Sequence, residues 1–271
     1  MKYKHLDLFS GIGGFSLGLE ATGGFETTAF CEIEEYPKKV LNKHWPNVPI
    51  YGDIKELNYE RLNADGVISD KRNVDILTGG YPCTPFSVAG RKKGEEDSRY
   101  LWPEMFRLVK ELRPTWVIGE NVSGHIKLGL DTVLQDLENQ GYSTRAFSIS
   151  ASSVGAKHQR ERVWVIAHSN VADTDSKRRC LWETNRQDAK DVGQSPRSEE
   201  HRQRNFIGRM DGIINGLPKG FYRHWGDKWE EGTPRVAENQ KNKTMRLKAL
   251  GNSVVPQIPY YIGLSILQTI N

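Results

Sequence analysis

Short apolar runs alternate with helical patterns over the first 168 residues of the chain. Each run is rich in apolar or β-branched residues and is bounded by Gly, Pro or polar residues, which is typical of strands. The six predicted strands are His5–Phe9, Thr27–Ile33, Val74–Thr78, Trp116–Gly119, Arg145–Ser150 and Val163–Ala167. Strands that alternate with helices predict a mostly parallel sheet between helical layers, the doubly wound α/β class.

Two of the intervening helices are clear from their apolar spacing. The first is predicted to follow Asp97 and Ser98, which can cap it, and to end before Pro114. Its apolar positions recur at steps of three and four residues, at Leu101, Met105, Leu108 and Leu112. The second repeats the spacing at Leu130, Val133, Leu134 and Leu137 and ends at Gly141.

The pattern changes after Ala167. Residues 169–207 are polar and aperiodic, as in a flexible surface loop, and residues 216–246 combine aromatic with basic side chains. That mixture suits a nucleic-acid surface, although a small aromatic core would look the same. A last helix from about Gln257 to Ile270 is expected to pack back on the sheet. We therefore predict a large domain of residues 1–168 and 247–271 with a small, mostly irregular domain at 169–246.

Length and composition narrow the class of protein. A chain of 271 residues that is 37% hydrophobic can bury a sizeable core. Neither a signal peptide nor an apolar stretch near the roughly 20 residues of a membrane span is present, so we expect a soluble, cytoplasmic protein. The three cysteines, Cys31, Cys83 and Cys180, are too widely spaced for a CxxC metal site, and no metal is expected. A net charge of +4 permits an anionic partner without requiring one.

A glycine-rich turn follows the first predicted strand. Gly11, Gly13 and Gly14 allow a tight turn into a helix whose N-terminus favours an anionic or polar ligand. A plain tight turn would have the same glycines, but Glu32 lies where such folds bind a ribose, and Asp53 is a plausible third contact. These residues indicate a cofactor that contains a nucleoside.

Three further segments carry candidate chemistry. Cys83 lies between prolines just after a strand, which favours an exposed nucleophile over a buried thiol. The next strand brings Glu120 to the same edge, as a helix cap or as a general acid with a raised pKa. Arg160 and Arg162 precede a strand and are expected on one face, with Glu161 on the other; singly, each would be a surface charge.

The ordered motifs of the chain resemble those of the cytosine-5 DNA methyltransferases. Besides Glu32, the motifs are DLFSGIGGF (7–15), GDI (52–54), GGYPCTPFS (79–87), GENVSG (119–124), QRERVWVIA (159–167) and ALGNSVVP (249–256). The resemblance implies a Rossmann-like domain that binds S-adenosyl-L-methionine, a smaller target-recognition domain, and a target cytosine that is flipped out of duplex DNA.

The resemblance also implies residue roles. Cys83 is similar to the nucleophile that adds to carbon 6 of cytosine, Glu120 to the carboxyl group at ring nitrogen 3, and Arg162, with Arg160, to the arginines that steady the base. The implied cofactor pocket comprises Phe9, Gly11, Gly13, Glu32, Asp53, Ile54, Pro82, Leu101, Asn252 and Ser253. The implied DNA contacts are Ser87, Arg91 and Lys92 around the loop of residues 90–98, and Trp229 and Arg235 in the recognition region.

The chain departs from the usual family pattern in three places. Tyr81 stands where many members have proline or phenylalanine, and Thr84 where glutamine is common, which leaves open which side chain fills the gap that the flipped base leaves. The recognition region after the polar stretch is only about 40 residues long, which favours a short target site.

Three rival functions remain at this stage. They are a tRNA cytosine methyltransferase, a non-catalytic DNA-binding protein on the same fold, and a dinucleotide oxidoreductase suggested by the glycine turn alone. The aromatic and basic region favours duplex DNA over tRNA, and the intact Cys83, Glu120 and Arg162 speak against a non-catalytic protein. We expect a monomer that acts on double-stranded DNA, with or without a cognate restriction endonuclease.

Overall fold

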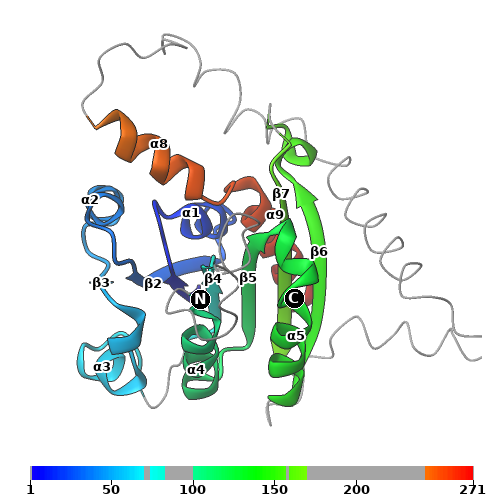
Figure 1. Cartoon of the computed structure of the whole chain (residues 1–271). Helices are drawn as coiled ribbons and strands as arrows, with labels where there is room; N and C mark the ends of the chain where they lie inside the picture. Colours follow the sequence, from blue (N-terminus) through cyan, green and yellow to red (C-terminus); the bar gives the residue numbers. More distant parts are fainter. Residues whose placement is uncertain (1, 70–73, 83–99, 157–158, 170–241, 271) are drawn as a thin grey trace, which may run out of the picture.

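The computed structural model describes residues 2–69, 74–82, 100–156, 159–169 and 242–270 (Figure 1). Its centre is a seven-stranded sheet with the strand order β3-β2-β1-β4-β5-β7-β6. The strands are β1 (Tyr3–Leu8), β2 (Phe25–Cys31), β3 (Ile50–Tyr51), β4 (Ile76–Gly79), β5 (Trp116–Val122), β6 (Tyr142–Ser150) and β7 (Glu161–Ser169). Every neighbouring pair is parallel except the two that include β7.

Helices cover both faces of this sheet. The α-helices are α1 (Gly14–Ala21), α2 (Glu35–His44), α3 (Tyr59–Ala64), α4 (Trp102–Leu112), α5 (Leu130–Asn139), α8 (Lys243–Asn252) and α9 (Gln257–Ile270). Short 3-10 helices are η1 (Ile54–Glu56), η3 (Ser123–Lys127) and η4 (Ala151–Val154). The doubly wound α/β class predicted from the sequence is confirmed, with β7 as the antiparallel strand.

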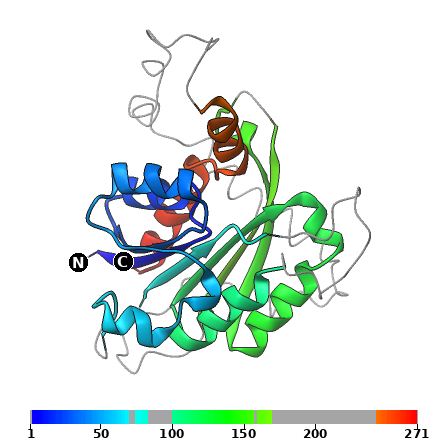
Figure 2. The same cartoon turned by 60° about the vertical axis from the view of Figure 1, so that its left-hand side comes forward.

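Two apolar clusters hold the layers together. On one face, α3, α4 and α5 pack against the sheet through residues such as Leu62, Met105 and Val133. On the other face, α1 and α9 lie side by side and bury Leu19 and Ile262 (Figure 2). The strict alternation of β1 separates these environments: Leu6 and Leu8 belong to the first cluster, whereas His5 and Asp7 point away from it.

The predicted elements agree well with the structure. All six predicted strands form, with ends shifted by a few residues, and α5 and α9 lie where their apolar spacing placed them. Helix α4 differs because it begins at Trp102, with Leu101 at its N-cap position and Pro103 in its first turn. The predicted capping residues Asp97 and Ser98 lie outside the described residues. The helix ends as predicted, because Arg113 adopts a left-handed conformation just before Pro114.

The register brings the carboxyl ends of the central strands to one edge of the sheet. Leu8 of β1 pairs with Cys31 of β2 and with Gly79 of β4, and Gly79 pairs in turn with Gly119 of β5. The residues that follow these strands therefore lie close together, as ligand-binding residues do in doubly wound sheets.

Candidate functional site

The glycine turn and Glu32 are joined directly. The backbone N–H of Gly11 donates to Oε2 of Glu32 at 2.7 Å, and the N–H of Glu34 donates to Oε1 at 2.7 Å. Glu32 is 8% exposed, and burial raises the pKa of its carboxyl group, against the effect of these two hydrogen bonds. Glu32 thus fixes the turn after β1 to the end of β2.

Gly11 and Gly13 of this turn have different surroundings. Gly11 and Gly13 both have positive φ angles, 54° and 84°, and so does Phe9, at 52°. A Cβ at Gly13 would lie 2.7 Å from Cζ3 of Trp45, so this position is closely packed. A Cβ at Gly11 would meet no atom within 4 Å, so the turn faces open space there, where a ligand could approach the backbone.

Asp53 and Ile54 lie beside Glu32. The N–H of Glu32 donates to the carbonyl of Tyr51 at 2.9 Å, which brings the end of β3 to this edge. Asp53 then caps η1 by accepting the N–H of Lys55 on Oδ1 at 3.0 Å, while Ile54 is buried. The structure thus brings Asp53 to the same edge of the sheet as Glu32, and its role as a cofactor contact stays a prediction.

The ALGNSVVP segment passes against the start of α1. A Cβ at Gly14 would lie 2.6 Å from the carbonyl oxygen of Val254 and 3.3 Å from Oγ of Ser253. Ser253, just after Asn252 at the end of α8, is therefore next to the glycine turn although 239 positions separate it from Gly14.

Glu120 and Arg162 form an ion pair across two neighbouring strands. Nε of Arg162 on β7 lies 3.2 Å from Oε1 of Glu120 on β5. Glu120 is 9% exposed, and burial raises the pKa of its carboxyl group, whereas Arg162 and Arg160 act to lower it. A Cβ at Gly80 would lie 3.4 Å from Oε2 of Glu120, so the loop after β4 runs directly beside this carboxyl group.

Arg160 has different partners from Arg162. Its Nη1 donates to the carbonyl of Gly251 at 2.5 Å, and its Nη2 donates to the carbonyl of Ser253 at 3.0 Å. Burial lowers the pKa of its guanidinium, as does the charge of Arg162. Arg160 lies just before β7 with a positive φ angle of 31°, so strand alternation does not determine its direction, and its hydrogen bonds hold the ALGNSVVP segment.

Tyr81 belongs to the interior, a position that the sequence left open. It is 2% exposed, its hydroxyl lies 3.0 Å from Nε2 of buried His125, and its ring lies 5.1 Å from that of Trp102. Nδ2 of Asn121 donates to the carbonyl of Tyr81 at 3.0 Å. Tyr81 is thus not placed to fill a gap in DNA, and its buried partner His125 was not among the residues expected from the sequence.

The structure describes only some of the other residues expected at the site. Pro82 is exposed at the end of the described loop, and Leu101 packs at the edge of the first apolar cluster. Cys83, Ser87, Arg91, Lys92, Trp229 and Arg235 lie outside the described residues, as does Thr84.

The comparison with protein families accounts for this set of motifs. Residues 3–211 match the family described as C-5 cytosine-specific DNA methylase. The chain belongs to this family. The Type II methyltransferase M.HgiBI of Herpetosiphon aurantiacus, which is 34% identical over 180 residues, aligns with 64% of this chain and 38% of its own length. M2.BsuMI of Bacillus subtilis, a Type II methyltransferase 31% identical over 241 residues, aligns with 84% of this chain and 52% of its own length.

The chain thus spans about half the length of these relatives or less. The fold extends further than the sequence likeness: the crystal structure of S. pombe Dnmt2 methyltransferase matches all of both chains with a TM-score of 0.61 at 16% identity. Within the described ranges, no cluster of His, Cys, Asp or Glu side chains could hold a metal ion. None of the helices in the described part of the chain has the length and hydropathy of a membrane span.

Proposed function

We propose that the chain transfers a methyl group from S-adenosyl-L-methionine to carbon 5 of a cytosine in duplex DNA. The observation that carries the proposal is the Glu120–Arg162 pair, which lies against the loop leading to Cys83. Family membership and relatives named Type II methyltransferases support DNA as the substrate.

The reaction needs a nucleophile because carbon 5 of cytosine is too weakly nucleophilic to take a methyl group directly. In the proposal the thiolate of Cys83 bonds to carbon 6, and the electrons of the 5,6 double bond shift to make carbon 5 enamine-like. After methylation, carbon 5 loses its proton, the double bond re-forms and the thiolate leaves. Cys83 lies outside the described residues, so this role depends on the resemblance.

Glu120 would act on ring nitrogen 3 of the same base. Burial favours its neutral acid, which can donate a hydrogen bond or a proton to nitrogen 3 as negative charge develops in the ring. Arg162 opposes that shift and fixes the direction of the carboxyl group. This combination suits an acid that must give up its proton and regain it in each turnover.

The turn after β1 fits the cofactor. The open space above Gly11 admits a ligand against the backbone, and Glu32 and Asp53 present carboxylates at the same edge, where they can accept hydrogen bonds from ribose hydroxyls. When bound, S-adenosyl-L-methionine supplies an electrophilic methyl group. We propose that Phe9, Gly13, Ile54, Pro82, Leu101, Asn252 and Ser253 complete the pocket.

DNA recognition is assigned to segments outside the described residues. Ser87, Arg91, Lys92, Trp229 and Arg235 would contact phosphates or bases around a flipped cytosine. We further propose that the protein acts as a monomer. Because its relatives are named Type II methyltransferases, a restriction endonuclease for the same site is the partner to seek.

Methyl transfer from labelled S-adenosyl-L-methionine tests the proposal. Duplex DNA should be labelled and tRNA should not; labelling of tRNA alone would replace DNA with RNA as the substrate. Cys83→Ser should abolish transfer while DNA and cofactor still bind, and duplexes with 5-fluorocytosine should trap a covalent complex. Bisulfite sequencing of DNA from expressing cells would then identify the modified base and its context.

A further inference from the structure

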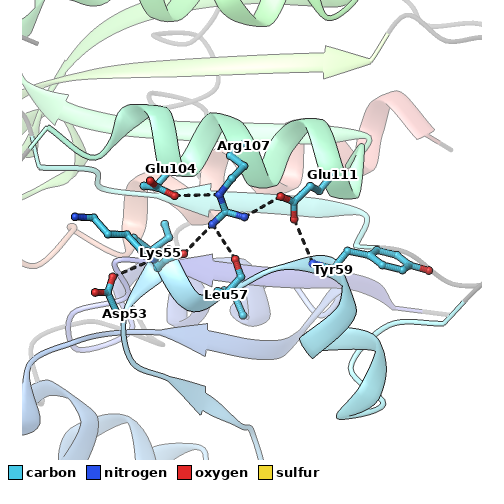
Figure 3. A network of polar contacts seen from close by, with 8 residues as sticks. Asp53, Lys55, Leu57, Tyr59, Glu104, Arg107 and Glu111 are labelled. Carbon is cyan, nitrogen blue, oxygen red and sulfur yellow. Dashed lines mark hydrogen bonds and ion pairs between the residues drawn. The ribbon is translucent and has the colours of Figure 1, made fainter.

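Arg107 on α4 is the centre of a polar network that the proposed reaction does not use (Figure 3). Its Nε pairs with Oε2 of Glu104 at 3.0 Å, and its Nη1 pairs with Oε1 of Glu111 at 2.8 Å. These two carboxylates, three residues before and four residues after Arg107 on the same helix, fix the plane of the guanidinium.

The other end of the guanidinium holds a separate segment. Nη2 of Arg107 donates to the carbonyls of Ile54 at 2.9 Å and Leu57 at 2.8 Å, which lie at the start of η1 and just after its end. The side chains of Ile54 and Leu57 are almost fully buried in the core. The turn is therefore fixed by its side chains in the core and by its carbonyl groups at Arg107.

Glu111 extends the same attachment to the next helix. Its Oε2 accepts the N–H of Tyr59, the first residue of α3, at 3.2 Å. The chain from Ile54 to Tyr59 is therefore tied to α4 at three backbone atoms, and all three ties depend on Arg107 or on its partner Glu111.

The segment that Arg107 holds begins at two proposed cofactor contacts. Asp53 is the N-cap of η1, and Ile54 is its first residue, so the directions of both follow from the conformation of this turn. We propose that Arg107 is a positioning residue for S-adenosyl-L-methionine: it does not touch the cofactor but keeps Asp53 and Ile54 in their binding arrangement. This inference rests on the proposed function.

Lysine cannot replace Arg107 in this role. The guanidinium directs donors from three nitrogens to four acceptors, two carboxylates on α4 and two carbonyls at η1, whereas an ammonium group places all its donors on one atom. If the turn holds its binding conformation only part of the time, the apparent Kd rises by the reciprocal of that fraction. We expect Kd to rise at least about fivefold, which corresponds to a turn that holds its binding conformation in about one fifth of the chains or fewer.

The matched control is Arg113, at the C-terminal end of the same helix. Its Nη2 donates to the carbonyl of Gln140 at 2.9 Å, and its guanidinium lies over the ring of Tyr142, so it also ties α4 to a neighbouring segment. That segment follows α5 and carries none of the proposed cofactor contacts. A general loss of stability should therefore affect Arg113→Gln and Arg107→Gln alike, but a positional effect should not.

The experiment measures cofactor binding and turnover in the full chain. Calorimetry with S-adenosyl-L-methionine should give an at least about fivefold higher Kd for Arg107→Gln, with kcat at saturating cofactor within about twofold of wild type. Arg113→Gln should leave Kd unchanged. Equal Kd values for Arg107→Gln and wild type, or an equal rise in both variants, would overturn the inference.

Two further measurements keep the test decisive. If Arg107→Gln does not fold, Arg107→Lys should have a higher Kd than wild type, and an unchanged Kd would reject the positioning role. Hydrogen exchange at the amides of Leu57 and Tyr59, measured without cofactor, should be faster in the Arg107 variants than in Arg113→Gln. Failure of the wild type to bind S-adenosyl-L-methionine would instead reject the proposed function. The two failures can be told apart, because the exchange measurement does not require the cofactor.

Discussion

His5 and Asp7 should have opposite effects on the pH dependence of stability. Both side chains are fully buried beneath α1. Oγ of Ser16 donates to Oδ2 of Asp7 at 2.7 Å, and Oγ1 of Thr78 lies 2.8 Å from Nε2 of His5 and donates to Oδ1 of Asp7 at 3.4 Å. Burial raises the pKa of Asp7 to about 7 and lowers the pKa of His5 to about 3.

The signs follow from proton counting. Between about pH 4 and pH 7, Asp7 binds a proton in the folded state but not in the unfolded state, so its contribution to stability falls as pH rises. His5 is neutral when folded and binds a proton when unfolded between about pH 3 and pH 6.5, so its contribution rises with pH over that window. Where the windows overlap, the two contributions cancel.

Replacing one of the two groups should reveal the other. For Asp7→Asn, the free energy of unfolding relative to wild type should rise by about 1.4 kcal/mol per pH unit, or about 3 kcal/mol from pH 4.5 to 6.5. For His5→Asn, the same difference should fall with a similar slope. The contributions of all titrating groups that the substitution leaves unchanged cancel when wild type is subtracted from the variant at each pH.

Urea denaturation of the wild type and both variants at pH 4.5, 5.5 and 6.5, with the m-value compared at each pH, measures these slopes. A difference that stays flat or falls with pH for Asp7→Asn would refute the reasoning. So would slopes of the same sign in the two variants, because opposite proton uptake is the basis of the prediction.

Three other substitutions test the site and its packing. Glu120→Gln should lower kcat by about 10²- to 10⁴-fold with little change in cofactor Kd, because the amide cannot deliver a proton; calorimetry beside steady-state kinetics checks both, and near-normal turnover would remove Glu120 from acid catalysis. Gly14→Ala should destabilise the fold by about 1–3 kcal/mol, since its Cβ would lie 2.6 Å from the carbonyl of Val254, and thermal unfolding without a loss would contradict that packing. Tyr81→Phe should reduce stability by about 1 kcal/mol through loss of its bond to His125, and an unchanged denaturation midpoint would show that the ring alone suffices.

The sequence predicted the parts of the fold that local patterns determine. Apolar runs identified the strands around Leu6 and Val163, and helical spacing identified α5 and α9, because period and burial are linked within each element. The positions of Gly11 and Glu32 were also accessible, since a turn after one parallel strand must lie near the end of its neighbour.

Contacts between distant segments were not accessible in this way. The donors of Arg160 meet carbonyls 91 and 93 residues away, and backbone carbonyls carry no signal in the sequence. Tyr81 was visible as a departure from the family pattern, but its partner His125 lies 44 residues later in a 3-10 helix with no distinctive periodicity. The two backbone carbonyls that Arg107 contacts, those of Ile54 and Leu57, were not accessible for the same reason.

The pairing of α1 with α9 has a consequence for synthesis of the protein. The second apolar cluster combines Phe15 and Leu19 from near the beginning of the chain with Ile258, Ile262 and Ile266 from residues 257–270. A chain still growing on the ribosome can complete the α4 side of its sheet early, but it exposes the opposite side until these last isoleucines have left the exit tunnel. Nascent chains should therefore bind chaperones through that uncovered face until α9 has been synthesised and has packed on α1.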